Sequence, residues 1–232
     1  MRRYRYLGVL IIVMASLFGI SGTSPAWYDE THLAIAKAAG YYKWYNAAGA
    51  DMAKLKAGRV ERDNHYCNNE RGTTVTPEMV LDQVDSYETV DEKGHLYGAI
   101  IASLRDYSAR KKEGKYGEYH MAFCAHYVSD LSMPLHNTVY SDFNKQHHAE
   151  IDGIINDEVL EKVDRIKIYP IRIDSERDLA EQIARIANLS MNLGYRLEDE
   201  KRLLTREEAY IQVSHSASLL KAILSYAEGR CD

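Results

Sequence analysis

The chain contains the stretch Tyr119-His-Met-Ala-Phe-Cys-Ala-His126-Tyr-Val-Ser-Asp130-Leu-Ser-Met-Pro-Leu-His136, which predicts a core helix over 119–131. Apolar side chains recur in it with helical period, and Pro134 disfavours further helix. His126 and Asp130 are about one turn apart, so they should project from one face. We expect His136 on the turn that follows.

The same offset returns farther along the chain, at His148 and Asp152. Imidazole nitrogens and carboxylate oxygens, with no cysteine among them, suit zinc in a site that keeps one position open for water. A single histidine–aspartate pair at this spacing is more often a contact on a helix surface than a metal site. One pair is therefore weak evidence, and only a larger set of donors in register makes the metal interpretation strong.

Helical periodicity runs through nearly all of the chain after residue 26, and almost no segment alternates like a strand. The predicted helices cover 31–45, 96–110, 119–131, 147–163, a segment from Asp174 or Ser175 to 197, a segment from Thr205 to about 229, and one that opens at Thr76-Pro77. We interpret 59–75 as a polar loop and 166–173 as a connector, because Pro170 would break a central strand. The sequence therefore predicts an all-α, single-domain multi-helix bundle, with any metal cluster in a cleft between facing helices.

The first 26 residues have the three parts of an export signal. Arg2, Arg3 and Arg5 form a basic start, residues 7–20 form an apolar run, and Ser24-Pro25-Ala26 places small residues where a signal peptidase cuts. The apolar run is shorter than the roughly 20 residues of a transmembrane helix. We expect a signal peptide over 1–26, cleavage after Ala26, export to the periplasm or the extracellular space, and one helical domain over 27–232. An uncleaved anchor is the second interpretation.

The composition fits one well-packed domain with an acidic surface. The chain is 46% hydrophobic and 27% charged, with a formal charge of −5. Cleavage would remove three arginines and make the protein more acidic, so its surface would offer no long-range attraction to polyphosphate backbones. The cysteines form no evident disulfide framework. Cys67 and Cys231 could pair in an oxidising compartment, and we expect Cys124 to be a small buried apolar residue.

Several spacings, taken in order, resemble one known family. They are Trp27 at the predicted new N-terminus with His32 five residues later, an Asn-His-aromatic motif at His65, the 126–136 segment with Met-Pro-Leu before its last histidine, and His148 with Asp152. Together they resemble the zinc-dependent phospholipase C family and the related tri-zinc nucleases that act on single strands. The resemblance covers 27–152, and beyond it the helices would only complete the bundle.

The resemblance implies three zinc ions held in a cleft. It implies that Asp63, His65, His126 and Asp130 bind one ion, that His136, His148 and Asp152 bind a second, and that His32 with the amino and carbonyl groups of Trp27 binds the third, with Asp130 as a bridge. The terminal amine would have to lose its proton, which its pKa near 8 makes inexpensive beside a dication. Relatives usually have a longer loop between the acid and the histidine than separates Asp63 from His65. Glu61 is therefore an alternative ligand.

Such a site would be suited to phosphodiester hydrolysis, because zinc lowers the pKa of bound water from 15.7 to about 7. The resemblance implies a phospholipase C-like hydrolase in which water attacks phosphorus and Asp63 is the general base. The substrate would be a phospholipid or another phosphodiester, with transient contact to a membrane surface. A single-strand nuclease is the first alternative, although the 66–75 loop offers Arg71 and little stacking or basic guidance for nucleic acid. A non-catalytic exported zinc protein is the second, although closed structural sites tend to be rich in cysteine.

Overall fold

The computed structural model describes residues 27–229, so the predicted signal peptide and Cys231 lie outside the described residues. Within this range the chain forms helices and no strand, which confirms the predicted all-α bundle. The α-helices are α2 (Asp29–Ala39), α3 (Gly49–Ala57), α4 (Arg59–Arg62), α5 (Pro77–Asp82), α6 (Leu96–Lys112), α7 (Glu118–Leu131), α8 (Asp142–Asp152), α9 (Glu176–Glu200) and α10 (Arg206–Gly229). Short 3-10 turns are η1 (Trp44–Asn46), η2 (Val84–Ser86), η3 (Pro134–Asn137) and η4 (Val163–Arg165).

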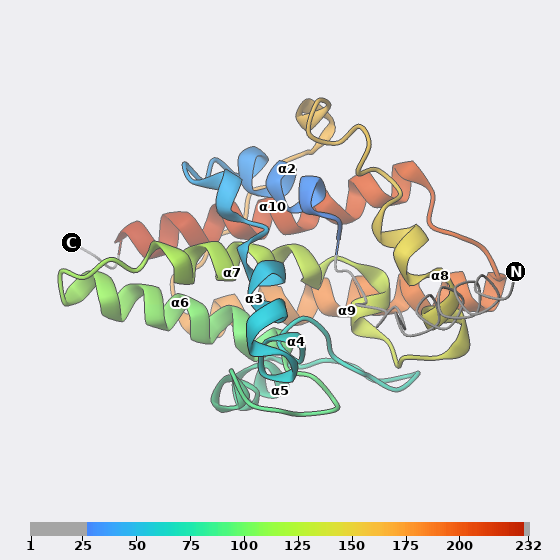
Figure 1. The fold of residues 1–232 in the computed structure, drawn as a ribbon, viewed down its shortest axis with the longest axis horizontal. Coiled ribbons are helices and arrows are strands. Elements are labelled where there is room, and N and C mark those ends of the chain that lie inside the picture. The colour runs from blue at the N-terminus through green and yellow to red at the C-terminus, as the bar shows by residue number, and fades with distance from the viewer. Residues whose placement is uncertain (1–26, 230–232) are drawn as a thin grey trace, which may run out of the picture.

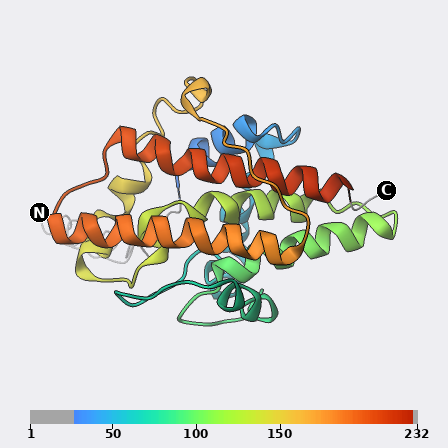
Figure 2. The same cartoon turned by 180° about the vertical axis from the view of Figure 1, so that it is seen from behind.

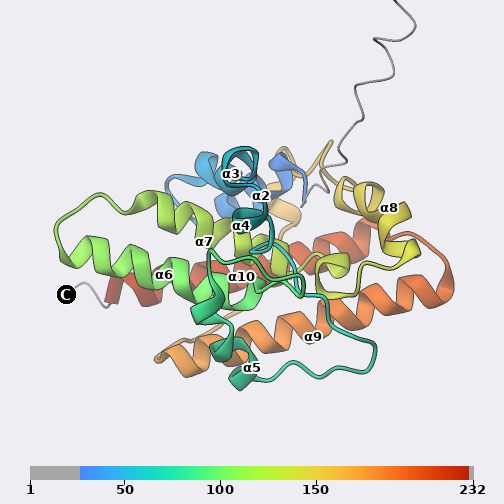
Figure 3. The ribbon, with the colours of Figure 1, turned by 60° about the horizontal axis from the view of Figure 1, so that its bottom comes forward.

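The four longest helices lie along the long axis of the molecule (Figure 1). Helices α6 and α7 form one antiparallel pair, and α9 and α10 form another that is seen in front in Figure 2. Helix α2 packs on α10, and α3 packs on α7. Figure 3 shows α3 and α4 above the middle of α7, with α8 near one end of the bundle. Short elements from the first half of the chain thus cover one side of α7.

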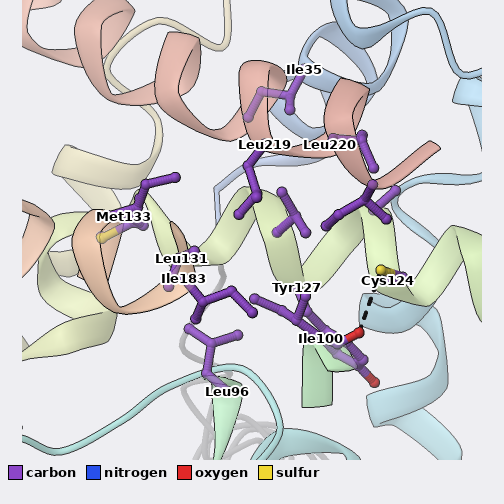
Figure 4. Close-up of a cluster of buried hydrophobic side chains, with 14 of the residues drawn as sticks. Ile35, Leu96, Ile100, Cys124, Tyr127, Leu131, Met133, Ile183, Leu219 and Leu220 are labelled. Atoms are coloured by element: carbon purple, nitrogen blue, oxygen red, sulfur yellow. Dashed lines mark hydrogen bonds between the residues drawn. The ribbon is translucent and has the colours of Figure 1, made fainter. Parts of the chain in front are cut away.

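The core lies between these helices, where α7 contributes buried side chains on nearly all sides. Figure 4 shows residues from α2, α6, α7, η3, α9 and α10 in contact there: Ile35, Leu96, Ile100, Cys124, Tyr127, Leu131, Met133, Ile183, Leu219 and Leu220. Cys124 is fully buried and its thiol donates to the carbonyl oxygen of Ile100, which confirms its predicted place in the core. Cys67 is also a buried free thiol. Burial of this kind is the main stabilising contribution to such a fold.

Three predicted helix starts are confirmed by their capping bonds. Thr76 accepts a hydrogen bond from the Met79 amide, with Pro77 at the first helical position. Ser175 forms a reciprocal capping box at the start of α9. Thr205 and Glu208 form the predicted box at the start of α10, with N···O distances of 3.0 and 3.2 Å. These side chains satisfy amide groups that have no partner inside the helix.

Two predicted helices have different bounds in the structure. The first, predicted over 31–45, ends at Ala39, because Gly40 adopts a left-handed conformation with φ of 84° and closes the helix. The second, predicted over 147–163, is α8. Its start is set earlier by Ser141, whose hydroxyl accepts from the Asn144 amide, and it ends before Gly153. A Cβ atom at Gly153 would lie 2.3 Å from the ring of Tyr28, so this turn packs tightly on the start of α2.

The segment 166–173 is a non-helical connector, as predicted. It runs beside α10, where the amides of Lys167 and Tyr169 donate to the hydroxyls of Ser214 and Ser218 at 2.9 Å. Serine hydroxyls of α10 thus accept backbone hydrogen bonds that a neighbouring strand would accept in a sheet. No helix among residues 27–229 is both long and apolar enough to cross a membrane.

Candidate metal centre

Helix α7 and the turn after it position three donors. His126 and Asp130 lie on one face of α7, with His126 Nε2 3.3 Å from Asp130 Oδ2. Pro134 begins η3, which returns His136 to the same face, with its Nδ1 3.6 Å from Asp130 Oδ1. Asn137 fixes this turn by donating to the carbonyl oxygens of Leu131, the last residue of α7, and of Met133, which follows it. The predicted geometry of this segment is therefore confirmed.

A first group of donors contains His65, His126 and Asp130, all buried. His65 follows α4, and its Nδ1 lies 2.8 Å from Asp130 Oδ2 and 3.2 Å from His126 Nε2. The two histidine rings meet edge to face. Two elements separated by a long stretch of chain thus bring two nitrogens and one oxygen within coordination reach of a common point.

A second group contains His136, His148 and Asp152, again all buried. His136 Nε2 is 3.2 Å from His148 Nε2, and the latter is 3.3 Å from Asp152 Oδ2. His148 and Asp152 are one turn apart on α8, as their spacing predicted. Gly194 on α9 permits this arrangement, because a Cβ atom there would lie 2.8 Å from the Pro134 carbonyl oxygen and displace η3.

A third group contains His32, Asp51 and His126. The rings of His32 and His126 are stacked, with centroids 3.8 Å apart. His126 Nε2 lies 3.6 Å from Asp51 Oδ1, and His32 Nε2 lies 3.6 Å from Asp130 Oδ1. Asp130 therefore stands beside donors of all three groups.

In three histidines, the ring nitrogen that points away from the other donors is held by a hydrogen bond. His126 Nδ1 bonds to the Ala47 carbonyl oxygen at 2.8 Å, His148 Nδ1 to Asn144 Oδ1 at 2.7 Å, and His65 Nε2 to Glu61 Oε1 at 3.2 Å. The carbonyl oxygen of Ala47 and the side-chain oxygen of Asn144 can only accept, so Nδ1 of His126 and of His148 carries the proton and Nε2 presents a lone pair. Such outer partners orient the histidine ligands of metal sites.

Ring nitrogens of the first two groups also lie close to other potential metal donors. His136 Nε2 faces His148 Nε2, and His65 Nδ1 faces a carboxylate oxygen of Asp130. Several buried atoms of the centre also have no hydrogen-bond partner among the described residues: both ring nitrogens of His32, Asp130 Oδ1, His136 Nδ1 and both carboxylate oxygens of Asp152. Burying polar atoms without partners is costly, and such atoms are rare in native proteins. Cations between these donors would remove that cost, so the residues fit metal ions.

Most protonation preferences agree with this chemistry, and His126 is the exception: burial would lower its pKa, but Asp130 and Asp51 outweigh burial and raise it above its usual value. Burial, together with the charge of His126, lowers the pKa of His32 to about 3. Burial likewise holds the pKa of His136 well below its usual value. Burial opposes ionisation of Asp130, but the neighbouring His126 and His136 outweigh it and hold its pKa well below the usual value. Neutral imidazole and ionised carboxylate are the forms that bind metal.

Asp152 behaves differently, since burial and the nearby negative charge of Asp130 raise its pKa well above the usual value. Among residues 27–229 no lysine or arginine nitrogen lies within 4 Å of its carboxylate, and its ion-pair neighbour is His148, whose Nε2 is 3.3 Å from Oδ2. An ionised Asp152 would therefore need a positive charge in the second group, and a divalent cation supplies one.

The predicted acidic ligand Asp63 belongs to none of the three groups. Its carboxylate accepts hydrogen bonds from Arg62 Nε at 3.1 Å, the Tyr66 hydroxyl at 3.0 Å and the Asp91 amide at 3.1 Å. The alternative, Glu61, is also outside the groups, and its Oε1 accepts from the Tyr127 hydroxyl at 2.6 Å. Both carboxylates are thus occupied by protein donors.

Asp51 on α3 stands where the acidic ligand was expected, and the sequence reasoning missed it. Its side chain is 22% exposed, and Oδ1 lies 2.5 Å from Lys54 Nζ. Burial would raise the pKa of Asp51, but His126 and Lys54 outweigh it and hold the pKa below its usual range. The sequence contains one indication that Asp51 faces inward. Ala47 and Ala50 are small apolar residues at helical spacing beside it, and both are buried.

Trp27 is fully buried and packs in the hydrophobic core just before α2. Its backbone precedes His32 by five residues along the chain. The remaining predicted donors, including His32, all lie in the three groups. Among the described residues, the donors are almost completely enclosed, and the partly exposed side chain of Asp51 is the most accessible of them.

No family model, characterised protein or solved structure matches this chain.

Proposed function

We propose that the protein is a zinc-dependent phosphodiester hydrolase of the phospholipase C type, exported after removal of residues 1–26. The observation that carries the proposal is the convergence of three histidine and aspartate groups around one buried carboxylate, Asp130. Structural zinc sites are usually closed and rich in cysteine, whereas these groups contain none. Nitrogen and oxygen donors of this kind suit catalytic zinc.

In the proposed enzyme the donors of the three groups would hold three zinc ions, with Asp51 assigned to the first ion because its Oδ1 lies 3.6 Å from His126 Nε2 and 4.0 Å from His65 Nδ1. His65, His126, Asp130 and Asp51 would bind the first, and His136, His148 and Asp152 the second. His32, with Asp130 and the backbone of Trp27, would bind the third. Zinc supplies Lewis acidity and lowers the pKa of water into the neutral range.

The side chains around the ions have separable roles in this proposal. We reassign the role of general base from Asp63 to Asp51, because Asp51 lies in a donor group and is partly exposed. Its carboxylate would orient the attacking water and accept a proton from it. Lys54 is held at the same carboxylate and brings a positive charge toward the anionic substrate. Glu61, Asn144 and the Ala47 carbonyl would keep the histidine rings oriented.

A single-strand nuclease is the second candidate, because aromatic rings and lysines lie near α3. Lys37 Nζ stands 5.2 Å from the centre of the Trp44 ring, and Lys43 Nζ stands 5.1 Å from that of Tyr42. Base stacking on such rings would suit a single strand.

The decisive experiment offers the zinc-loaded protein a chromogenic phosphocholine ester and single-stranded DNA in parallel, with and without chelator. Metal content is measured on the same sample by mass spectrometry. We expect three zinc ions and chelator-sensitive cleavage of the phosphocholine ester. Cleavage of DNA alone would establish the nuclease instead. Full zinc loading without cleavage of either substrate would establish a non-catalytic zinc protein.

The terminal amine of Trp27 can be tested separately. One alanine placed between Ala26 and Trp27, with cleavage before it, would move the amino group away from His32. We expect one zinc ion fewer per protein molecule in that variant. Three ions in a protein whose N-terminus is shown by sequencing to be the added alanine would contradict the role of the amine.

A further inference from the structure

The outward face of α3 carries two exposed apolar side chains beside Lys56, whereas an ordinary surface helix turns its large apolar side chains inward. Met52 and Leu55 on this helix are 66% and 73% exposed, while Ala50 is fully buried. The residues before α3 continue the pattern, since η1 and the turn that follows it are nearly helical. Tyr45, which is 60% exposed, precedes Met52 by two helical turns. Met52 and Leu55 therefore form one exposed stripe on α3, here named the α3 stripe, and Tyr45 adds an exposed ring in the turn η1 before it.

Basic residues surround the α3 stripe. Between Lys37 and Arg62 the sequence holds six basic residues and two acidic residues, although the whole chain has a net charge of −5. The two acids are directed inward, since Glu61 is 3% exposed and Asp51 lies in the metal centre. Four of the six basic residues are paired with acids: Lys43 with Glu118, Lys54 with Asp51, and both Arg59 and Arg62 with Asp63. The segment still directs basic side chains and no acidic side chain of its own outward, on a protein whose net charge is negative.

Tyrosine and lysine side chains extend the apolar surface beside the stripe. Tyr42 and Tyr116 are both about two-thirds exposed, and Lys43 Nζ lies 5.1 and 4.9 Å from their ring centres. Lysine stems cover apolar surface while their charges reach water, and tyrosine rings prefer the boundary between apolar and polar phases. This combination is typical of surfaces that rest on lipid headgroups.

We propose that the α3 stripe and its basic border dock on a bilayer that contains anionic phospholipids. The charge of the segment is complementary to such a bilayer, and the exposed aliphatic side chains of Met52 and Leu55 can enter its outer layer. Those two side chains favour lipid over nucleic acid, because they offer no aromatic face for a base. The inference rests on the proposed function in one respect: α3 also carries Asp51, so docking would bring lipid phosphates beside the metal centre.

The test is flotation of the zinc-loaded protein with vesicles of phosphatidylcholine alone, or of phosphatidylcholine with 30% phosphatidylglycerol. We expect binding to the anionic vesicles that weakens in 0.5 M salt. Leu55→Glu should reduce the partition coefficient by about tenfold or more, since it replaces an inserted apolar side chain with a charge. Ile211→Glu is the matched control, because Ile211 is also exposed, at 51%, but lies on α10. It should bind like the unmodified chain.

Three outcomes would overturn the inference. The first is no binding to anionic vesicles, and the second is equal loss in the Leu55→Glu and Ile211→Glu variants. The third applies if the unmodified protein does not float with vesicles. Loss of self-association or of binding to single-stranded DNA in the Leu55→Glu variant would then assign the α3 stripe to another partner. Vesicle binding without cleavage of the soluble phosphocholine ester would support the docking surface and count against the proposed hydrolase. Cleavage of the ester without vesicle binding would support the proposed hydrolase and count against the docking surface.

Discussion

Asp51 and Asp63 differ in what surrounds their carboxylates. Asp63 is enclosed by donors from Arg62, Tyr66 and the Asp91 amide, whereas Asp51 faces His126 in the metal centre. The family resemblance implied Asp63 as the acidic ligand, although relatives usually have a longer loop between the acid and the histidine than separates Asp63 from His65. The structure instead brings an acid from α3 to the histidines, because a turn of helix directs neighbouring side chains such as Asp63 and His65 to different sides.

Substitution of these two aspartates should therefore separate two functions. Asp51→Asn should lower kcat/KM for the phosphocholine ester by on the order of 10²–10⁴-fold, as expected for loss of a general base, and should reduce zinc content. Asp63→Asn should retain zinc and activity but unfold at a lower temperature, because it weakens a buried hydrogen-bonded carboxylate. Steady-state rates, metal analysis and thermal unfolding of both variants check this. Equal activity losses without a change in metal content would contradict the assignment.

Glu61 provides a test of the hydrogen bonds behind the ligands. Its carboxylate accepts from His65 Nε2 and from the Tyr127 hydroxyl. Glu61→Gln keeps the shape but removes the charge, so the His65 ligand becomes less basic. We expect zinc affinity to fall by about 10–100-fold, the usual effect of losing such a partner. Competition with a fluorescent chelator measures it, and Glu158→Gln on the surface should leave the affinity unchanged.

The elements that carry the centre were predictable to different degrees. Helix α7 has strong apolar periodicity and a proline after its end, so its bounds and its ligand face followed from sequence. Helix α3 was not predicted, because it is short, begins with glycine and has exposed apolar side chains that obscure its inward side. The predicted start of α8 was too late in the chain, because the Ser141 cap lies several residues before the histidines from which the helix was predicted.

The contact between η3 and α9 tests how an element controls the second donor group. Gly194→Ala would place a methyl group 2.8 Å from the Pro134 carbonyl oxygen and so displace the turn that carries His136. We expect a loss of about 1–3 kcal/mol in stability, as for other overpacked sites, and weaker binding of one zinc ion. Gly229→Ala is the control, because nothing lies within 4 Å of its added Cβ atom. Denaturant unfolding and zinc titration compare the two, and equal behaviour would refute the role of Gly194.

At the scale of the whole molecule, the metal-free protein should lose stability as the pH falls. His32 has a pKa of about 3 in the folded chain and near 6.5 when unfolded. Between these pH values the unfolded state therefore binds more protons than the folded state. The contribution of His32 to the free energy of unfolding is complete above pH 6.5 and declines toward pH 3. His136, Asp130 and Asp51, whose pKa values are lowered, act in the same direction, whereas Asp152 and His126, whose pKa values are raised, oppose it.

The contribution of His32 can be isolated by substitution. In chelator-treated protein, the unfolding free energy should depend less steeply on pH between 6.5 and 3 in His32→Phe than in the unmodified chain. Urea unfolding at several pH values measures both slopes. An unchanged slope would show that His32 does not titrate differently in the two states.

The donors of the centre come from positions spread between His32 and Asp152, and they become neighbours only when α2, α3, α7, η3 and α8 have packed together. An unfolded chain has no preformed place for an ion, so capture must be a late step of maturation. The number of bound ions would therefore indicate whether a molecule has folded correctly. A molecule with one displaced helix would lack at least one ion.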